Sequence, residues 1–177
     1  MPGGRYFPNM AYYNSNGKIY VIGGFDASFV ESATTWEYDP VANSWNTARL
    51  NIPVAMAGST TSIAGQFIYL VGTWNTALGS TLHYRYDITN NSWATMAPAP
   101  VNIYEAAGGA MGGLTYLVGG GNPARPAGPR PGLHGLSSGD APTVSYNSTY
   151  IYDIAGNSWL TGPNTNALGA TSLIALA

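Results

Sequence analysis

The sequence contains IYVIGG at residues 19–24, a stretch that returns as IYLVGT at 68–73 and as TYLVGG at 115–120. Each copy is a short run of β-branched and aromatic residues that ends at glycine, which is typical of a β-strand followed by a turn. These glycines are expected to leave room where neighbouring strands approach each other closely. Because the stretch returns at a nearly fixed distance, the sequence predicts repeated units of about 48 residues.

A second motif follows each of these strands. It reads YDPVANSW at residues 38–45, YDITNNSW at 86–93 and YDIAGNSW at 152–159. The aspartate is expected to accept backbone N–H groups in the turn between two strands, a structural role that we favour over calcium binding. The tyrosine and the tryptophan supply large flat faces that are expected to fill the space between neighbouring units.

Glycines upstream of the apolar stretches keep the same spacing. Gly17, Gly65 and Gly113 are 48 residues apart, and each lies just before a predicted strand, where a tight hairpin turn requires a positive φ. Each unit therefore reads as four short strands. The predicted strands are 9–15, 18–23, 34–39 and 44–48 in the first unit, 55–63, 66–71, 80–87 and 92–96 in the second, and 104–111, 114–118, 148–153 and 158–160 in the third.

This combination of motifs resembles the Kelch repeat, which forms one four-stranded blade of a β-propeller. The resemblance covers nearly the whole chain, with two departures. Thr73 replaces the second glycine of its unit, and the basic residue that some Kelch repeats carry before the Gly-Gly strand is not evident. The resemblance implies an all-β, Kelch-type β-propeller portion with three four-stranded antiparallel blades plus one extra C-terminal strand. The expected blades are about 5–50, 51–99 and 100–163, with a long loop at 121–147 and the extra strand at about 167–176.

The chain has few charged residues for its length. Among 177 residues, 6 Lys+Arg and 8 Asp+Glu give a net charge of −2 and a charged fraction of 8%, against about 25% in ordinary domains. Such scattered basic residues form no stripe that neutralises phosphates, so we expect no nucleic-acid partner. We also expect no membrane span, because no apolar run approaches the roughly 20 residues required. The neutral, hydroxyl-rich composition favours an extracellular or cell-surface location, with a cytoplasmic location as the alternative.

The residue types that most enzymes use are sparse in this sequence. Without cysteine, the chain has no disulfide, no thiolate metal site and no thiol nucleophile. Some Kelch-like propellers are copper oxidases with a Tyr–Cys crosslink and Tyr and His ligands, a site that this chain, with only His83 and His134, does not form. We therefore expect no metal and no other cofactor. Glu105 lies at the entry to the predicted strand 104–111, which is expected to be innermost, and there it would line the central channel.

Three blades are fewer than the four to eight that close a typical propeller, and an uncovered blade flank is an aggregation hazard. Three ways of covering the flanks stay open. The chain is a fragment of a longer propeller, two copies pair as half-propellers, or the strand at 167–176 adds to the next copy. The expected partners are thus further propeller blades or copies of the chain itself, and we expect no stable monomer.

The resemblance also implies a ligand face at one end of the blades, where a protein or glycan would bind. The loops expected to build it are 25–33, 73–79 and 121–147. The third loop begins with a proline-rich segment and is expected to lack regular secondary structure, so it is either functional or filler. The candidate binding residues in these loops are Asp26, Trp74, Asn75, Arg125, Arg130, His134 and Asp140.

The sequence as a whole favours a non-catalytic Kelch propeller module over an enzyme. Such a module would bind protein or glycan, or take part in extracellular structural assembly. The alternative is a fragment of a sugar-acting propeller enzyme whose catalytic residues lie mostly in other blades. An enzyme would bring acids or histidines together at the channel mouth, whereas a structural module would show Tyr, Asn, Ser and Gly there.

Overall fold

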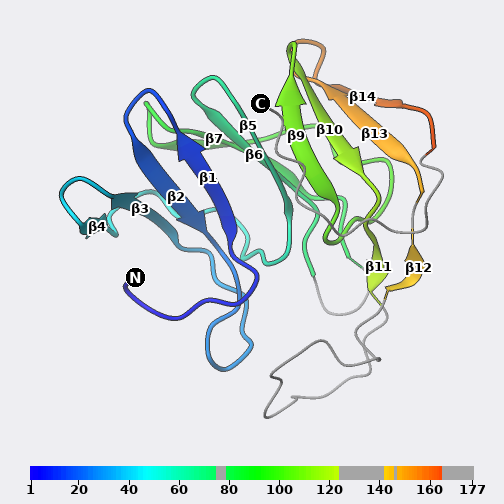
Figure 1. The fold of residues 1–177 in the computed structure, drawn as a ribbon. Coiled ribbons are helices and arrows are strands. Elements are labelled where there is room, and N and C mark those ends of the chain that lie inside the picture. Colours follow the sequence, from blue (N-terminus) through cyan, green and yellow to red (C-terminus); the bar gives the residue numbers. More distant parts are fainter. Residues whose placement is uncertain (75–78, 124–141, 146, 165–177) are drawn as a thin grey trace.

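The structure, a computed structural model, describes residues 1–74, 79–123, 142–145 and 147–164. Over these residues the regular structure consists of β-strands, which form three four-stranded antiparallel sheets and one two-stranded sheet (Figure 1). This confirms the all-β, three-bladed fold. Within the same ranges, there is no helix with the length and apolar character needed to cross a membrane. The extra strand expected at 167–176 lies outside the described residues.

Each large sheet is one repeat unit whose strands are paired in chain order. The first contains β1 (Asn9–Tyr13), β2 (Lys18–Ile22), β3 (Thr35–Asp39) and β4 (Ser44–Asn46). The second contains β5 (Thr60–Ala64), β6 (Phe67–Val71), β7 (His83–Asp87) and β8 (Ser92–Thr95). The third contains β9 (Ala107–Met111), β10 (Leu114–Val118), β13 (Thr149–Asp153) and β14 (Ser158–Thr161). We call these sheets blades 1, 2 and 3.

The first strand of every blade lies on the inner side of the assembly. Strand β5 contacts both β1 and β9, so these three strands are neighbours in space although they belong to different sheets. Strands β4 and β14 lie at opposite outer edges (Figure 1). The blades therefore radiate from a common inner side, as the propeller fold requires.

Several strands begin later than predicted, because the residues before them pair outside their own sheet. The segment before β5 turns to blade 1, where the Gly24 N–H donates to the Met56 carbonyl at 2.8 Å. The segment before β9 turns to blade 2 in the same way, with Ser80 and Ile103 in an isolated bridge. These residues have strand-like composition, but their hydrogen bonds join two blades.

The long loop of blade 3 is not structureless throughout, and this expectation was wrong at its two ends. Strand β11 (Gly121–Pro123) pairs with β12 (Pro142–Ser145) to form the two-stranded sheet, with a register shift between Asn122 and Pro123. Both strands are short and contain proline, so no alternating pattern in the sequence indicated them. Residues 124–141 lie outside the described part of the chain.

Buried tyrosines hold neighbouring blades together. The ring centroids of Tyr20 in blade 1 and Tyr86 in blade 2 are 6.1 Å apart, and those of Tyr69 in blade 2 and Tyr152 in blade 3 are 6.0 Å apart. All four side chains have an exposed fraction of 0%. The prediction that aromatic faces fill the space between the units is confirmed for these pairs.

Glycine at the end of β2 allows the next blade to come close. Gly23 has a φ of 65°, and a Cβ atom added there would collide with the backbone carbonyl of Met56. Gly72, at the equivalent place in blade 2, would collide in the same way with Ile103. The hairpin glycines Gly17, Gly65 and Gly113 also have the positive φ values that their spacing predicted.

Substitution of Gly23 by alanine should destabilise the protein by roughly 3 kcal/mol or more, because a positive φ is combined with a collision of the added Cβ with the Met56 backbone. Gly65→Ala is the matched control, since Gly65 has a φ of 57° and open space around it. Its cost should be only about 1–2 kcal/mol. Urea unfolding of both variants measures the difference, and equal losses would contradict the proposed role of Gly23.

Candidate functional site

The two ends of the blades differ in structure. At one end lie the short hairpin turns and the repeated Tyr-Asp turns. At the other end lie the longer connections 5–8, 23–34, 53–59, 72–74, 79–82 and 102–106, which we call the loop face. The two-stranded sheet of β11 and β12 is on this side as well (Figure 1). The loop face therefore corresponds to the ligand face expected from the sequence.

Five aromatic rings follow one another across the loop face, from blade 1 to the segment before blade 3. Tyr6 stacks on Phe29 with a centroid distance of 5.3 Å, and Phe29 lies 6.4 Å from Phe25. Phe25 contacts Trp74 edge-on at 6.1 Å, and Trp74 contacts Tyr104 edge-on at 4.6 Å. We call these five residues the aromatic ladder. Edge-to-face and offset contacts of this kind are favourable beyond simple burial.

Backbone pairing fixes the rings of the ladder in place. Tyr6 and Phe25 exchange two N–H···O hydrogen bonds at 2.9 and 2.8 Å, and Tyr104 exchanges two with Gly121, both at 3.1 Å. Phe29 has a φ of 58°, an uncommon conformation for a bulky residue that persists only where the surroundings enforce it. The loop therefore presents Phe29 in one defined position against Tyr6.

The ladder is open to solvent at the blade 1 end and closed at the other. Tyr6 is 48% exposed, and Val30, which follows Phe29 in the chain, is 59% exposed. Phe25 and Tyr104 are buried. An exposed apolar surface supported by buried rings is typical of an interaction site.

Of the seven predicted binding residues, the structure describes Asp26 and Trp74. Trp74 is the fourth ring of the ladder and lies between Phe25 and Tyr104. Asp26 shapes the loop, because its Oδ1 accepts the N–H groups of Ser28 at 2.8 Å and Val30 at 3.0 Å. The other five, Asn75, Arg125, Arg130, His134 and Asp140, lie outside the described residues.

Thr73, the departure from the glycine pattern, has a structural role that the sequence did not reveal. Its buried hydroxyl accepts the Ala57 N–H at 2.9 Å and lies 3.1 Å from the Ala57 carbonyl and 3.3 Å from Glu31 Oε1. Glu105 is partly buried just before the inner strand β9, with its own N–H bonded to the Gly58 carbonyl. In the described residues, no three His, Asp or Glu side chains come together as a metal site would require.

Thr73→Val should lower the free energy of unfolding by about 1–3 kcal/mol, because the shape is kept while the buried Ala57 N–H loses its acceptor. Thr115→Val is the matched control, because Thr115 is also fully buried but its hydroxyl has no hydrogen-bond partner in the described structure. That variant should be neutral or stabilising. Denaturant unfolding of the two proteins measures both effects. A Thr73→Val protein as stable as the control would contradict the assignment.

The repeated turn at the opposite end contains an asparagine whose role spacing alone did not show. Asn43, Asn91 and Asn157 all have φ values of 47–49°, a conformation that asparagine tolerates better than most residues. Each side-chain oxygen accepts the hydroxyl of the tyrosine five residues earlier, at 2.8, 2.6 and 2.7 Å respectively. The aspartates also behave as predicted, since Asp39, Asp87 and Asp153 each accept N–H groups of their turn.

The same asparagine and the nearby tryptophan bind the backbone of the preceding blade. Asn91 Oδ1 accepts the Leu50 N–H at 2.9 Å, while Trp93 Nε1 donates to the Leu50 carbonyl at 2.9 Å. Asn157 and Trp159 bind both backbone groups of Ala97 in the same way, at 2.8 and 2.9 Å. We call this asparagine and tryptophan pair the backbone clamp. It secures the segment that leaves one blade against the turn of the next.

Comparisons with known proteins agree with this repeat geometry. The sequence model of the Kelch motif matches residues 14–49. Kelch-like protein 15 of mouse and of human is 33% identical over 112 residues, which is 59% of this chain but only 18% of either relative. The solved structure of YjhT superimposes with a TM-score of 0.75 at 15% identity, covering 98% of this chain and 59% of that one.

Residues 14–49 match the Kelch motif, and the fold of the chain is that of a Kelch-type β-propeller. Its three sheets are Kelch blades, and the motif match spans most of blade 1 and the segment that follows it. The match covers less than a fifth of the Kelch-like protein 15 sequences, so the activity of those whole proteins is not carried over. The likeness to YjhT concerns the fold alone.

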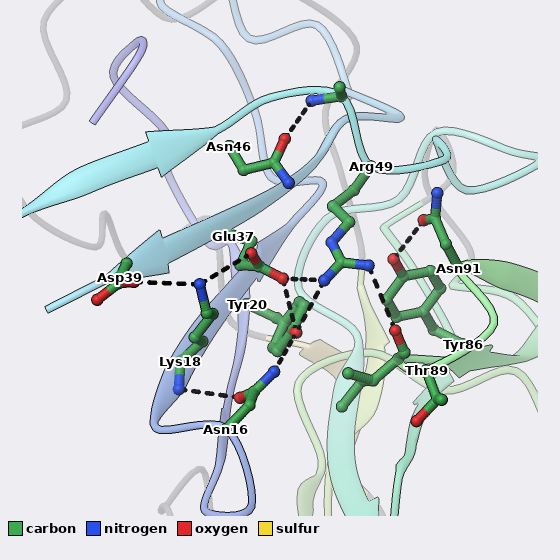
Figure 2. A network of polar contacts seen from close by, with 12 residues as sticks. Asn16, Lys18, Tyr20, Glu37, Asp39, Asn46, Arg49, Tyr86, Thr89 and Asn91 are labelled. Atoms are coloured by element: carbon green, nitrogen blue, oxygen red, sulfur yellow. Dashed lines mark hydrogen bonds and ion pairs between the residues drawn. The ribbon is translucent and has the colours of Figure 1, made fainter. Parts of the chain in front are cut away.

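A polar network crosses the interface between Kelch blades 1 and 2 (Figure 2). Glu37 accepts the Tyr20 hydroxyl at 2.7 Å and forms an ion pair with Arg49. Arg49 also donates to the Ile88 carbonyl of blade 2. Burial acts to raise the pKa of Glu37, but the hydrogen bonds from Tyr20 and Arg49 outweigh it, so the pKa lies below its ordinary value. Glu37 is therefore a structural anion that joins two blades.

The interface between Kelch blades 2 and 3 uses a histidine instead. His83 packs edge-on against Tyr152 at 4.4 Å and contacts the Trp159 ring at 5.4 Å, and its Nδ1 lies 3.0 Å from the Ala97 carbonyl. Burial lowers the pKa of His83 to about 4, although the hydrogen bond to Ala97 opposes the shift. His83 is therefore a buried, neutral residue of this interface, and its Nε2 has no hydrogen-bond partner in the described part of the chain.

Stability should therefore decline as the pH falls from about 6.5 to about 4. The folded state holds His83 neutral, so the unfolded chain takes up a proton first, and the stabilisation present above pH 6.5 is lost on the way down. The full effect is up to about 3 kcal/mol. His83→Gln should flatten this part of the pH profile, measured by urea unfolding. An unchanged slope in that variant would contradict the role of His83.

Proposed function

We propose that the chain is a non-catalytic Kelch module that binds a protein partner at the open end of the aromatic ladder. The observation that carries the proposal is the exposed Tyr6 and Val30 surface, which is supported by the stacked Phe29 and the buried Phe25. Rigid aromatic side chains with buried support lose little conformational entropy on binding and dominate many interfaces. The partner that suits this surface is an extended segment with apolar side chains.

Two observations favour a protein over a glycan or a substrate. The exposed part of the surface combines aromatic and aliphatic side chains, Tyr6 with Val30, whereas a sugar ring stacks best on an aromatic face flanked by polar groups. The acidic side chains nearby are engaged in the fold, as with Asp26 in its loop and Glu31 beside Thr73. Glycan binding and a sugar-acting enzyme remain the alternatives that the experiment below distinguishes.

We further propose that additional blades complete the module, either from a longer protein or from another copy. An extracellular location, supported only by the low charged fraction of 8%, belongs to the same proposal. Strand addition through residues 167–176 is a third route to completion, and it concerns residues outside the described ones.

Peptides selected from a random library against the wild-type protein test the loop-face proposal. Tyr6→Ser and Val30→Ser should each weaken the binding of the selected peptides by about 10-fold or more, because contacts at the centre of an interface carry most of its binding energy. Val41→Ser is the matched control, since Val41 is 95% exposed but lies at the opposite end of blade 1. Binding constants come from calorimetry, with thermal unfolding as a check that each variant is folded.

Equal affinity of the peptides for Tyr6→Ser, Val30→Ser and Val41→Ser would contradict the proposal. The glycan alternative would be favoured by a different pair of results. No peptide would be selected, and the wild-type protein, but not Tyr6→Ser, would bind to a glycan array.

A further inference from the structure

We infer that the outer flank of blade 1 is a docking site for a second copy of this chain, with Tyr38, Asn43 and Trp45 receiving the segment that leaves strand β14 of that copy. The inference rests on the proposed completion of the module and specifies which surfaces make it. It is independent of binding at the loop face.

The first observation concerns six equivalent tyrosines, two in each blade. The four at the two internal interfaces are fully buried, as described above. Their counterparts on the outer flanks are Tyr38 in blade 1 and Tyr116 in blade 3, and both are only partly buried. At each internal interface, the tyrosine equivalent to Tyr38 in one blade contacts the tyrosine equivalent to Tyr116 in the preceding blade. The two outer flanks are therefore complementary halves of one kind of interface.

The second observation is that the backbone clamp of blade 1 holds no backbone segment in the described structure. Asn91 and Asn157 each accept a tyrosine hydroxyl and a backbone N–H. Asn43 accepts the Tyr38 hydroxyl but, within the described residues, no backbone N–H from another blade. Trp45 packs against Tyr38 at 4.8 Å, as Trp93 packs against Tyr86. The clamp of blade 1 is thus preformed.

The third observation is that blade 3 carries the segment that fits this clamp. The Gly162 N–H donates to the Thr149 carbonyl at 2.7 Å, as the Met96 N–H donates to the His83 carbonyl at 2.9 Å. The chain leaves β14 as it leaves β8, so Pro163 corresponds to Ala97, the residue that the clamp of blade 3 binds. Pro163 is exposed in the structure. Its carbonyl is placed to accept the Trp45 indole of a second copy.

A second copy of this chain fits the flank because it brings both matching parts, Tyr116 and the 162–164 segment, on one flank of blade 3. When blade 3 of each copy meets blade 1 of the other, a two-fold axis relates the two copies, and no outer flank is left uncovered in the dimer. The fit has one flaw. Proline has no N–H, so Asn43 would keep only its bond to Tyr38. A substitution that supplies this N–H should therefore strengthen the association of the two copies, and this gain can be tested.

The experiment is sedimentation equilibrium of the full chain over a range of concentrations. The wild type should show a monomer–dimer equilibrium. Trp45→Phe removes the indole donor and should weaken association about 5-fold or more, whereas Pro163→Ala supplies the N–H for Asn43 and should strengthen it by a similar factor. Val41→Ser is the control and should change nothing, because its equivalents Thr89 and Ala155 stay exposed at the internal interfaces.

A wild type that remains monomeric at all concentrations would overturn the inference, and so would a dimer that responds equally to Trp45→Phe and Val41→Ser. If Trp45→Phe proves unfolded by circular dichroism, Pro163→Ala decides alone, and no gain in affinity would overturn the inference. Tyr6→Ser should dimerise like the wild type, so that failure of the loop-face proposal and failure of the dimer are seen separately.

Discussion

The need to cover the flat flanks of each blade determines most of this structure. A four-stranded sheet of this size buries little on its own, so the tyrosines of β2, β6, β7 and β13 become buried only by meeting a tyrosine of the neighbouring blade. The glycine at the end of β2 follows from this constraint, because it lets the next blade approach to backbone contact. Where no neighbour is present, as at Tyr38 and Tyr116, the equivalent side chains stay partly exposed.

The repeat satisfies this constraint with a few residues that each serve two purposes. The asparagine of the turn adopts a positive φ, accepts the tyrosine hydroxyl of its own blade and, at Asn91 and Asn157, also accepts a backbone N–H of the preceding blade. The interfaces are not copies of each other. Glu37 and Arg49 supply a charged network at one, and the neutral His83 fills the other. The backbone clamp is common to both, and the side chains around it vary.

The sequence predicted what is local and repeated. It predicted the three sheets, the Asp turns and the hairpin glycines, because each depends on a few adjacent residues and occurs three times. It did not predict the aromatic ladder, since Tyr6 and Tyr104 are far apart in the chain and their rings are linked only through residues of other segments. It placed the starts of β5 and β9 too early, because a strand-like composition does not reveal which partner a segment bonds. The role of Thr73 depends on Ala57 in the same way.

The central claim is that blades are held together by the asparagine and tryptophan pair of one blade on the backbone of the blade before it. Hydrogen exchange of the tryptophan indole N–H groups, followed by NMR in dilute protein, tests this most directly. The account predicts slow exchange for Trp93 and Trp159, which donate to Leu50 and Ala97, and fast exchange for Trp45. Similar exchange rates for all three indoles under conditions where the chain is monomeric would contradict it.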